Sequence, residues 1–241
     1  MFLALYYANT ECSVLVFNSG SKRTKKAMAR KTLGLRRNLK EKERRAAITR
    51  AAIKVFSAKG YDRATMDDIV AETDFSKSLI YWYWQNKAAL FSELIDICMT
   101  QYRELLQRTM DSHEPFLDKF DKLLWDFAAL FNKNEQLNKL VHFGSLHSSK
   151  EKGEDFKKKV NRYYRIFLKQ IEKLLRQGID QGVIRPDIDI EAFAFVFLAC
   201  DEGYIYMSML DERMGIERAM IQPLLKYVVP NFLLKRHRNR A

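Results

Sequence analysis

The stretch AAIKVFSAKGYDRATMDDIVAETDFSKSLIYWYWQNKAALFSELI, residues 51–95, predicts a series of short helices. Apolar residues before Gly60 follow helical spacing, and Gly60 stands where a glycine commonly ends a helix. Thr65, with an acidic residue three places later, is typical of the N-cap of a second helix. Ser76 and Asn86 can cap a third and a fourth helix. Three helices with a tight turn between the second and the third predict a helix-turn-helix.

The remainder of the chain also has helical periodicity, and it lacks strand-like runs joined by hairpin turns. Amphipathic runs precede a much more apolar run at residues 190–210. We therefore expect an all-α protein in three parts. These are an apolar leader and a flexible basic arm at residues 1–40, a helix-turn-helix domain at residues 41–91, and a larger helical domain at residues 92–241.

Positive charge is concentrated near the two ends of the chain. Residues 22–45 contain 12 Lys or Arg and two acidic residues, and residues 235–241 contain four more Lys or Arg. The rest of the chain is slightly acidic. A local basic arm is typical of a protein that meets a polyanion such as DNA, although a solvated tail without a partner has the same composition.

The N-terminal segment and the cysteines indicate a cytoplasmic protein. Three cysteines lie far apart without metal-site spacing, as free thiols in a reducing compartment do. The apolar run at residues 1–17 is too short and interrupted to span a membrane, and it lacks the positive charge of a signal peptide. We interpret residues 1–27 as making no contribution to function, because Met28 offers another start. A weak membrane-surface anchor is the alternative.

The quoted stretch resembles the DNA-binding segment of the TetR family of bacterial transcriptional regulators. The shared positions are Gly60-Tyr61, Thr65, Ile69, Ser76-Lys77, Tyr81, Tyr83 and the run Lys87-x-Ala89-Leu90-Phe91. The resemblance implies a homodimer that binds a palindromic double-stranded DNA operator and a small-molecule effector. We expect a repressor that the effector releases from DNA. A transcriptional activator, or a ligand-independent and weakly specific DNA-binding protein, is the alternative.

The resemblance also assigns DNA contacts to the third helix and to neighbouring helix N-termini. Side chains on the exposed side of the third helix read base edges, and the Tyr81 hydroxyl and the Lys87 ammonium bind phosphates. Lysine at a helix N-terminus disfavours the helix itself, which favours the phosphate role for Lys87. Helical spacing places Ile80, Tyr83 and Trp84 on one face, which we assign to the core. The expected DNA-binding residues are Thr65, Ser76, Lys77, Ser78, Leu79, Tyr81, Trp82 and Lys87.

The larger domain is expected to bind the effector and to dimerise. Aromatic residues favour a lipophilic or aromatic effector over a sugar or a nucleotide, although an aromatic stripe also fits a core. The expected effector-binding residues are Trp125, Phe127, Phe131, His142, Phe143, Tyr164 and Phe167. The apolar run at 190–210, with Leu224, Leu225, Val228 and Phe232 of the last helix, is expected to form half of a symmetric four-helix interface. A core helix within one protomer would have the same pattern.

Motifs of common enzyme classes are missing from the sequence. It contains no nucleophile elbow, Walker loop, dinucleotide-binding fingerprint or HExxH motif. We therefore expect no enzymatic activity, no cofactor and no metal site.

Overall fold

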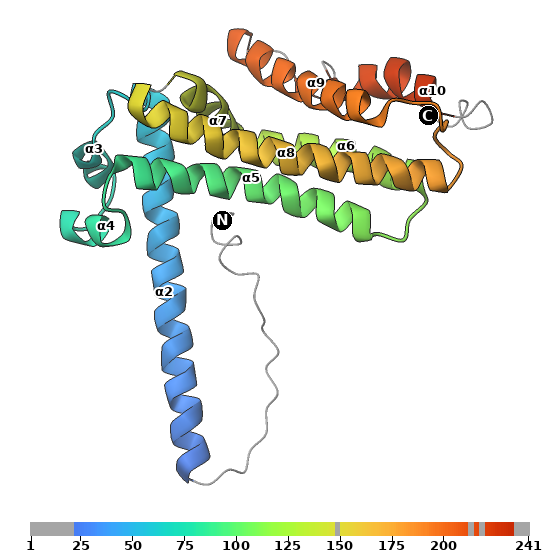
Figure 1. The fold of residues 1–241 in the computed structure, drawn as a ribbon. Helices are drawn as coiled ribbons and strands as arrows, with labels where there is room; N and C mark the ends of the chain where they lie inside the picture. Colours follow the sequence, from blue (N-terminus) through green and yellow to red (C-terminus); the bar gives the residue numbers. More distant parts are fainter. Residues whose placement is uncertain (1–21, 148–149, 212–214, 217–219, 234–241) are drawn as a thin grey trace. The chain divides into compact units, whose positions relative to one another are not determined.

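The computed structural model describes residues 22–147, 150–211, 215–216 and 220–233, and they are predominantly helical (Figure 1). Within these ranges there is no strand, and Ile184 and Leu233 form one isolated bridge. The expected all-α class is confirmed. No helix in the described ranges is long and apolar enough to cross a membrane. The apolar leader up to residue 21 and the basic tail after residue 233 lie outside these ranges.

The chain divides into two compact units, residues 1–93 and 94–241. The described part of unit 1, from Lys22 onward, contains three helices and the first residues of a fourth, and the caps of the last three of these helices are those that the sequence predicts. The Asp68 N–H donates to Thr65 Oγ1 and the Thr65 N–H donates to Asp68 Oδ2, a reciprocal capping box. Ser76 Oγ and Asn86 Oδ1 accept backbone N–H groups of the next two helices. The helices are α2 (Lys22–Lys59), α3 (Met66–Ala71), α4 (Lys77–Tyr83) and α5 (Lys87–Asp111), the last shared with unit 2.

The first helix begins earlier than the sequence suggested. We expected a flexible arm through residue 40, but α2 already begins at Lys22. The segment before Arg45 is rich in Lys, Arg, Leu and Ala, which favour helices, and it contains no proline. The helix continues through Gly34, the one residue of this segment that commonly weakens a helix, and the basic arm forms the first half of α2.

Three aromatic rings form the centre of unit 1. Phe56, Tyr61 and Phe91 are buried, and their ring centroids lie 4.9–5.8 Å apart. Gly60 ends α2 with a φ of +76°, a backbone conformation that glycine adopts without strain. This turn brings Tyr61 back onto Phe56, and the short helices are thereby held against α2.

Unit 2 is a bundle of helices around an aromatic core. Phe127 contacts both Tyr102 and Phe167, and Phe193 packs on Phe232 with ring centroids 4.4 Å apart. Helices α8 and α9 lie against each other (Figure 1). The helices after α5 are α6 (Phe116–Lys133), α7 (Glu135–His147), α8 (Lys150–Asp180), α9 (Ile190–Leu210), the π-helical turn η2 (Leu224–Val228) and α10 (Val229–Phe232).

Candidate functional site

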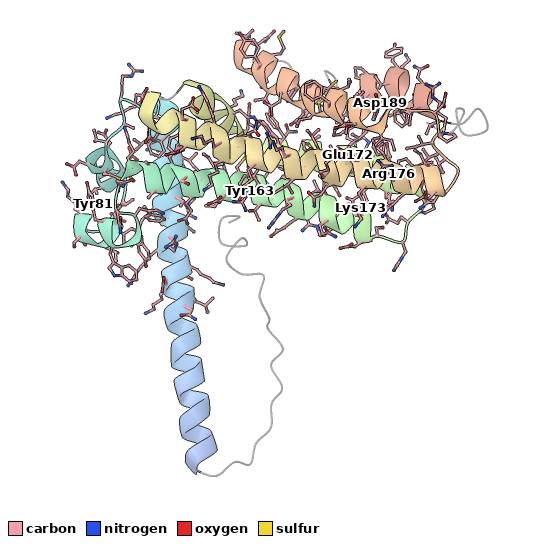
Figure 2. All side chains as sticks on the ribbon, viewed as in Figure 1. Tyr81, Tyr163, Glu172, Lys173, Arg176 and Asp189 are labelled. Carbon is pink, nitrogen blue, oxygen red and sulfur yellow. The ribbon has the colours of Figure 1, made fainter. Side chains whose placement is uncertain are left out.

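Helix α4 presents most of the predicted DNA-binding side chains to solvent. Trp82 is 70% exposed, and Tyr81 projects from the same short helix (Figure 2). Lys77 is exposed, and its ammonium pairs with Asp67 at 2.7 Å. Thr65, Ser76 and Ser78 are also exposed, whereas Leu79 is half-buried. We call the exposed side of α4, with its N-cap Ser76, the α4 surface; its residues are Ser76, Lys77, Ser78, Leu79, Tyr81 and Trp82.

The other face of α4 is fixed by buried contacts. Ile80 is fully buried and Trp84 is 3% exposed, as their assignment to the core predicted. The indole N–H of Trp84 donates to Glu93 Oε2 at 2.6 Å, and Arg45 pairs with the same carboxylate oxygen. The Arg45 guanidinium also lies over the rings of Trp84 and Tyr83, 4.8 and 5.3 Å from their centroids. Arg45 therefore holds α4 in place. The sequence did not show this role, because Arg45 is one of many basic residues in the arm.

The structure corrects the role predicted for Lys87. Its ammonium donates to the backbone carbonyls of Tyr61, Asp62 and Ala64, at distances of 2.7, 3.0 and 2.8 Å. These bonds match the three N–H donors of a lysine, and the ammonium also lies 4.5 Å from the centre of the Tyr61 ring. Lys87 therefore tethers the loop between α2 and α3 instead of projecting toward a phosphate. The carbonyls offset the unfavourable position at a helix N-terminus.

Replacing Lys87 with methionine is expected to reduce the free energy of unfolding by about 2–4 kcal/mol, because three loop carbonyls lose a charged donor. Denaturant unfolding of the purified variant measures this change. Lys54→Met is the matched control, since Lys54 pairs with Glu72 on the surface, and such pairs contribute at most about 1 kcal/mol. A Lys87→Met protein with wild-type stability and weakened DNA binding would restore the phosphate role.

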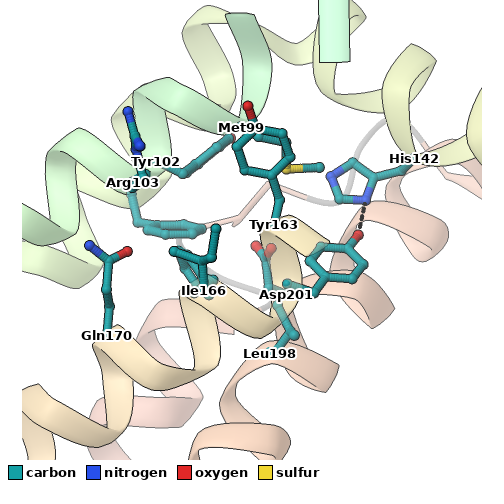
Figure 3. Close-up of a pocket in the computed structure, with 12 residues that line it drawn as sticks. Met99, Tyr102, Arg103, His142, Tyr163, Ile166, Gln170, Leu198 and Asp201 are labelled. Carbon is teal, nitrogen blue, oxygen red and sulfur yellow. Dashed lines mark hydrogen bonds between the residues drawn. The ribbon is translucent and has the colours of Figure 1, made fainter. Parts of the chain in front are cut away.

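Unit 2 contains a small pocket with aromatic walls. Residues of α5, α6, α7, α8 and α9 line it, and its cavity volume is about 30 Å³, room for about two water molecules. Four of the predicted effector-binding residues, Phe127, His142, Tyr164 and Phe167, line this pocket. The further lining residues are Met99, Tyr102, Arg103, Tyr163, Ile166, Gln170, Leu198 and Asp201 (Figure 3).

Three of the predicted effector-binding residues are not placed in this pocket. Trp125 is partly exposed on α6 and does not line it. Phe131 is buried against Tyr204, so it belongs to the core. Both lie on an amphipathic helix, where spacing alone does not reveal which turn faces a cavity. The side chain of Phe143 lies outside the part of the chain that the structure describes.

A part-buried hydrogen-bond network joins two of the lining residues, His142 and Tyr164, to Glu202. His142 Nδ1 lies 2.9 Å from both Glu202 Oε2 and the Tyr164 hydroxyl, which also donates to Glu202 Oε1. Burial alone would lower the pKa of His142, but the hydrogen bond and the charge of Glu202 outweigh it and raise this pKa. Burial, followed by the charge of Glu202, raises the pKa of Tyr164. The network therefore favours a protonated His142 beside a carboxylate.

Asp201 is a buried acid among the lining residues that the sequence interpretation missed. Burial, and secondarily the charge of Glu202, raises its pKa to about 7, although His142 opposes this shift. The signal was present in the sequence, since Asp201 and Glu202 are adjacent acids in the middle of the apolar run at 190–210. An acidic pair inside a buried helix carries a desolvation cost that a purely structural helix avoids.

One face of α9 is apolar and exposed. Phe195 and Leu210 are 63% and 67% exposed, and between them lie small or apolar residues at helical spacing. The opposite face packs within unit 2. We call the exposed face the α9 stripe; its residues are Ala192, Phe195, Val196, Ala199, Gly203, Tyr206, Met207 and Leu210.

The last helical segment contributes less to this exposed face than the sequence suggested. Leu224 and Phe232 are buried within the protomer, and Phe232 packs on Phe120 and Phe193. Their predicted place in an interface between protomers is therefore wrong. Leu225 and Val228 are half-exposed, and Tyr227 is 62% exposed. An apolar helix periodicity does not distinguish burial within one chain from burial between two.

Both units match known protein families. Residues 48–94 match the family model described as bacterial regulatory proteins of the tetR family, and residues 147–222 match a tetracyclin repressor-like C-terminal domain. The HTH-type transcriptional regulator YfiR of Bacillus subtilis (strain 168) is 27% identical over 173 residues, which are 69% of this chain and 80% of YfiR. IcaR of Staphylococcus epidermidis, the negative transcriptional regulator of the biofilm operon icaADBC, is 30% identical over 89 residues, 37% of this chain and 46% of IcaR.

Solved structures show the same fold. SmeT, the repressor of the Stenotrophomonas maltophilia multidrug efflux pump SmeDEF, superposes with a TM-score of 0.66 at 19% sequence identity. The match covers 79% of this chain and 91% of SmeT. A complex of SmeT with triclosan matches with a TM-score of 0.63 at 21% identity, over 75% of this chain and 89% of that one.

Proposed function

Because this chain belongs to the TetR family of bacterial transcriptional regulators, we propose that it is a homodimeric, cytoplasmic repressor released by a small lipophilic or aromatic effector. Two α4 surfaces bind the half-sites of a palindromic operator, and the effector occupies the pocket of unit 2. The observation that carries this proposal is the α4 surface, where a 70% exposed tryptophan stands on a helix whose other face is fixed by buried contacts.

The α4 surface has the chemistry to read a duplex. A helix fits the major groove, where Leu79 can pack on thymine methyl groups and the Trp82 indole can donate to a base or contact a methyl group. Tyr81 is placed to donate its hydroxyl to a phosphate. The exposed ion pair between Lys77 and Asp67 is weak, so the ammonium can exchange Asp67 for DNA. The basic first half of α2 adds attraction that does not depend on sequence.

The α9 stripe supports a dimer. Large apolar side chains that lie in one stripe are costly to leave in water. In a two-fold symmetric dimer, the α9 stripe of a second copy would cover them with equally apolar side chains. Ala199 and Gly203 allow two helices to approach closely at the middle of the stripe. A two-fold symmetric dimer also places two α4 surfaces for the two halves of a palindrome.

Two relatives support repression and effector binding. IcaR is a negative regulator, and SmeT is a repressor with a triclosan complex. The aromatic walls of the pocket suit an aromatic or lipophilic guest. The cavity is small, so a guest of that size requires lining side chains to move, and this movement links occupancy to a change in unit 2.

A gel shift with the DNA upstream of the protein's own gene tests the proposal. We expect a complex that survives an excess of competitor duplex and dissolves when the effector is added. Equal binding to both duplexes would contradict sequence-specific regulation. A saturating ligand that leaves operator affinity unchanged would contradict induction while leaving specific binding in place.

Trp82→Ala is expected to weaken binding to the preferred operator by about 1–3 kcal/mol, because a groove contact is lost. Affinity for unrelated duplex should stay close to that of the wild type, since phosphate contacts remain. Fluorescence anisotropy with both duplexes at one salt concentration measures the two affinities. Trp125→Ala removes an exposed tryptophan of unit 2 and should change neither. An equal loss on both duplexes would show that Trp82 does not contribute to sequence preference.

A further inference from the structure

One acid in the pocket wall has an unused acceptor. Asp201 is 7% exposed, and its Oδ1 atom is buried without a hydrogen-bond partner among the residues that the structure describes. Its neighbour Glu202 differs, because both of its carboxylate oxygens are bonded to His142 and Tyr164. A buried acceptor without a partner costs free energy, and in this position Asp201 lines a cavity (Figure 3).

A second unpaired acceptor faces the same pocket. Gln170 of α8 lines it, and its Oε1 atom is buried without a partner in the described ranges. A glutamine amide can present either its oxygen or its N–H₂ by rotating, so Gln170 alone does not fix the chemistry of a guest. Asp201 does fix the chemistry of a guest above about pH 7, where its carboxyl is ionised, because a carboxylate only accepts hydrogen bonds. The guest must therefore donate.

The charges around the pocket decide whether the donor is cationic or neutral. Arg103 also lines the pocket, but it is exposed, so water screens its charge. The buried end holds Asp201 beside Glu202, with His142 as the counter-charge already bonded to Glu202. An anionic guest would have to enter next to two acids, whereas an ammonium would complete the pairing of Asp201.

Aromatic and aliphatic side chains form much of the remaining wall. Tyr102, Phe127 and Phe167 form a chain of rings with centroids 4.6 and 5.7 Å apart, and Leu198 lies on the same helix as Asp201. Aromatic faces stabilise a nearby ammonium as well as an apolar body. Apolar walls around a single buried acid form a complement to a molecule with one amine and an aromatic or aliphatic body.

We propose that the effector pocket binds a lipophilic amine, with its ammonium donating to Asp201 Oδ1 and its apolar body among the rings. This inference rests on the proposed function and narrows its effector from any lipophilic molecule to a cationic one. Asp201 is then a specificity-determining residue, because a neutral or anionic molecule of the same shape leaves its carboxylate unpaired.

A matched series of benzylamine, benzyl alcohol and benzoate tests the proposal by calorimetry on the full chain at about pH 8, where benzylamine is still largely protonated. We expect benzylamine to bind at least about tenfold more tightly than the other two. Asp201→Asn should abolish that preference, whereas Asp126→Asn, at an exposed acid of α6, should keep it. Thermal melting of both variants verifies that they fold.

Several results would overturn the proposal. They are tighter binding of benzoate, equal binding of the three molecules, an unchanged preference in Asp201→Asn, or no benzylamine binding at about 10 mM.

Operator binding in the presence of benzylamine separates this inference from the proposed function. Benzylamine that binds without releasing DNA leaves the ligand class standing and contradicts induction. Release of DNA by an anionic or neutral molecule alone supports induction and contradicts the ligand class.

Discussion

Replacing Phe195 and Leu210 together with glutamate is expected to convert the dimer into monomers and to weaken operator binding at least about a thousandfold. These side chains stand near the two ends of the α9 stripe and are more than half exposed in the protomer. In a symmetric interface each new carboxylate would be buried against apolar side chains or another carboxylate. A monomer reads one half-site, so its affinity falls toward that of non-specific binding.

Analytical ultracentrifugation and operator titration of the same variant measure the two effects. Trp125→Glu is the matched control, because it places a carboxylate on an exposed apolar position of α6 outside the stripe. The control should remain dimeric and bind normally. A Phe195→Glu, Leu210→Glu protein that stays dimeric would show that the interface lies elsewhere.

Asp201→Asn is expected to stabilise the protein above pH 7 by up to about 4 kcal/mol. In the folded protein, burial and the charge of Glu202 raise the pKa of Asp201 to about 7, although the charge of His142 lowers it in part. In the unfolded chain the pKa keeps its ordinary value near 4. Between about pH 4 and pH 7, the folded state therefore binds more protons at Asp201 than the unfolded state does. Wild-type stability therefore falls as the pH rises from about 4 to 7, and asparagine removes that loss.

Denaturant unfolding of the wild type and Asp201→Asn at several pH values between 5 and 8 measures this difference. The difference should already be about 1–2 kcal/mol at pH 5 and should grow until about pH 7, then level off. Asp126→Asn should follow the wild type, because its carboxyl is exposed. A difference that is constant with pH, or one that shrinks as the pH rises, would contradict a buried carboxyl in the pocket.

The fold of unit 1 was largely predictable because local signals act over a few residues. Thr65 and Ser76 accept N–H groups within their own turns, and Gly60 provides the left-handed backbone at the end of α2. The role of Lys87 was not predictable in this way. Its three carbonyl partners lie 23–26 residues earlier, and a charge pattern in the sequence does not show which carbonyls converge on it.

The pocket was less accessible to sequence reasoning than the helices. Aromatic spacing identified Phe127, Tyr164 and Phe167, but the same spacing included Phe131, which packs in the core. The polar groups that give the pocket its chemistry come from α7, α8 and α9, so their convergence depends on how these helices pack. The burial of Leu224 and Phe232 within the protomer was not predictable for the same reason. An apolar side chain can be buried equally well within one chain or between two chains.

Selection from a pool of random-sequence duplex DNA tests whether the protein is a sequence-specific dimeric regulator. The dimer that we propose should enrich an inverted repeat whose half-sites lie about one helical turn, or a whole multiple of it, apart. Within that repeat, Trp82→Ala should shift the preferred bases, and Phe195→Glu with Leu210→Glu should reduce enrichment to single half-sites or to none. Recovery of no motif by the wild-type protein, at a salt concentration where it still binds DNA, would contradict a sequence-specific dimeric regulator.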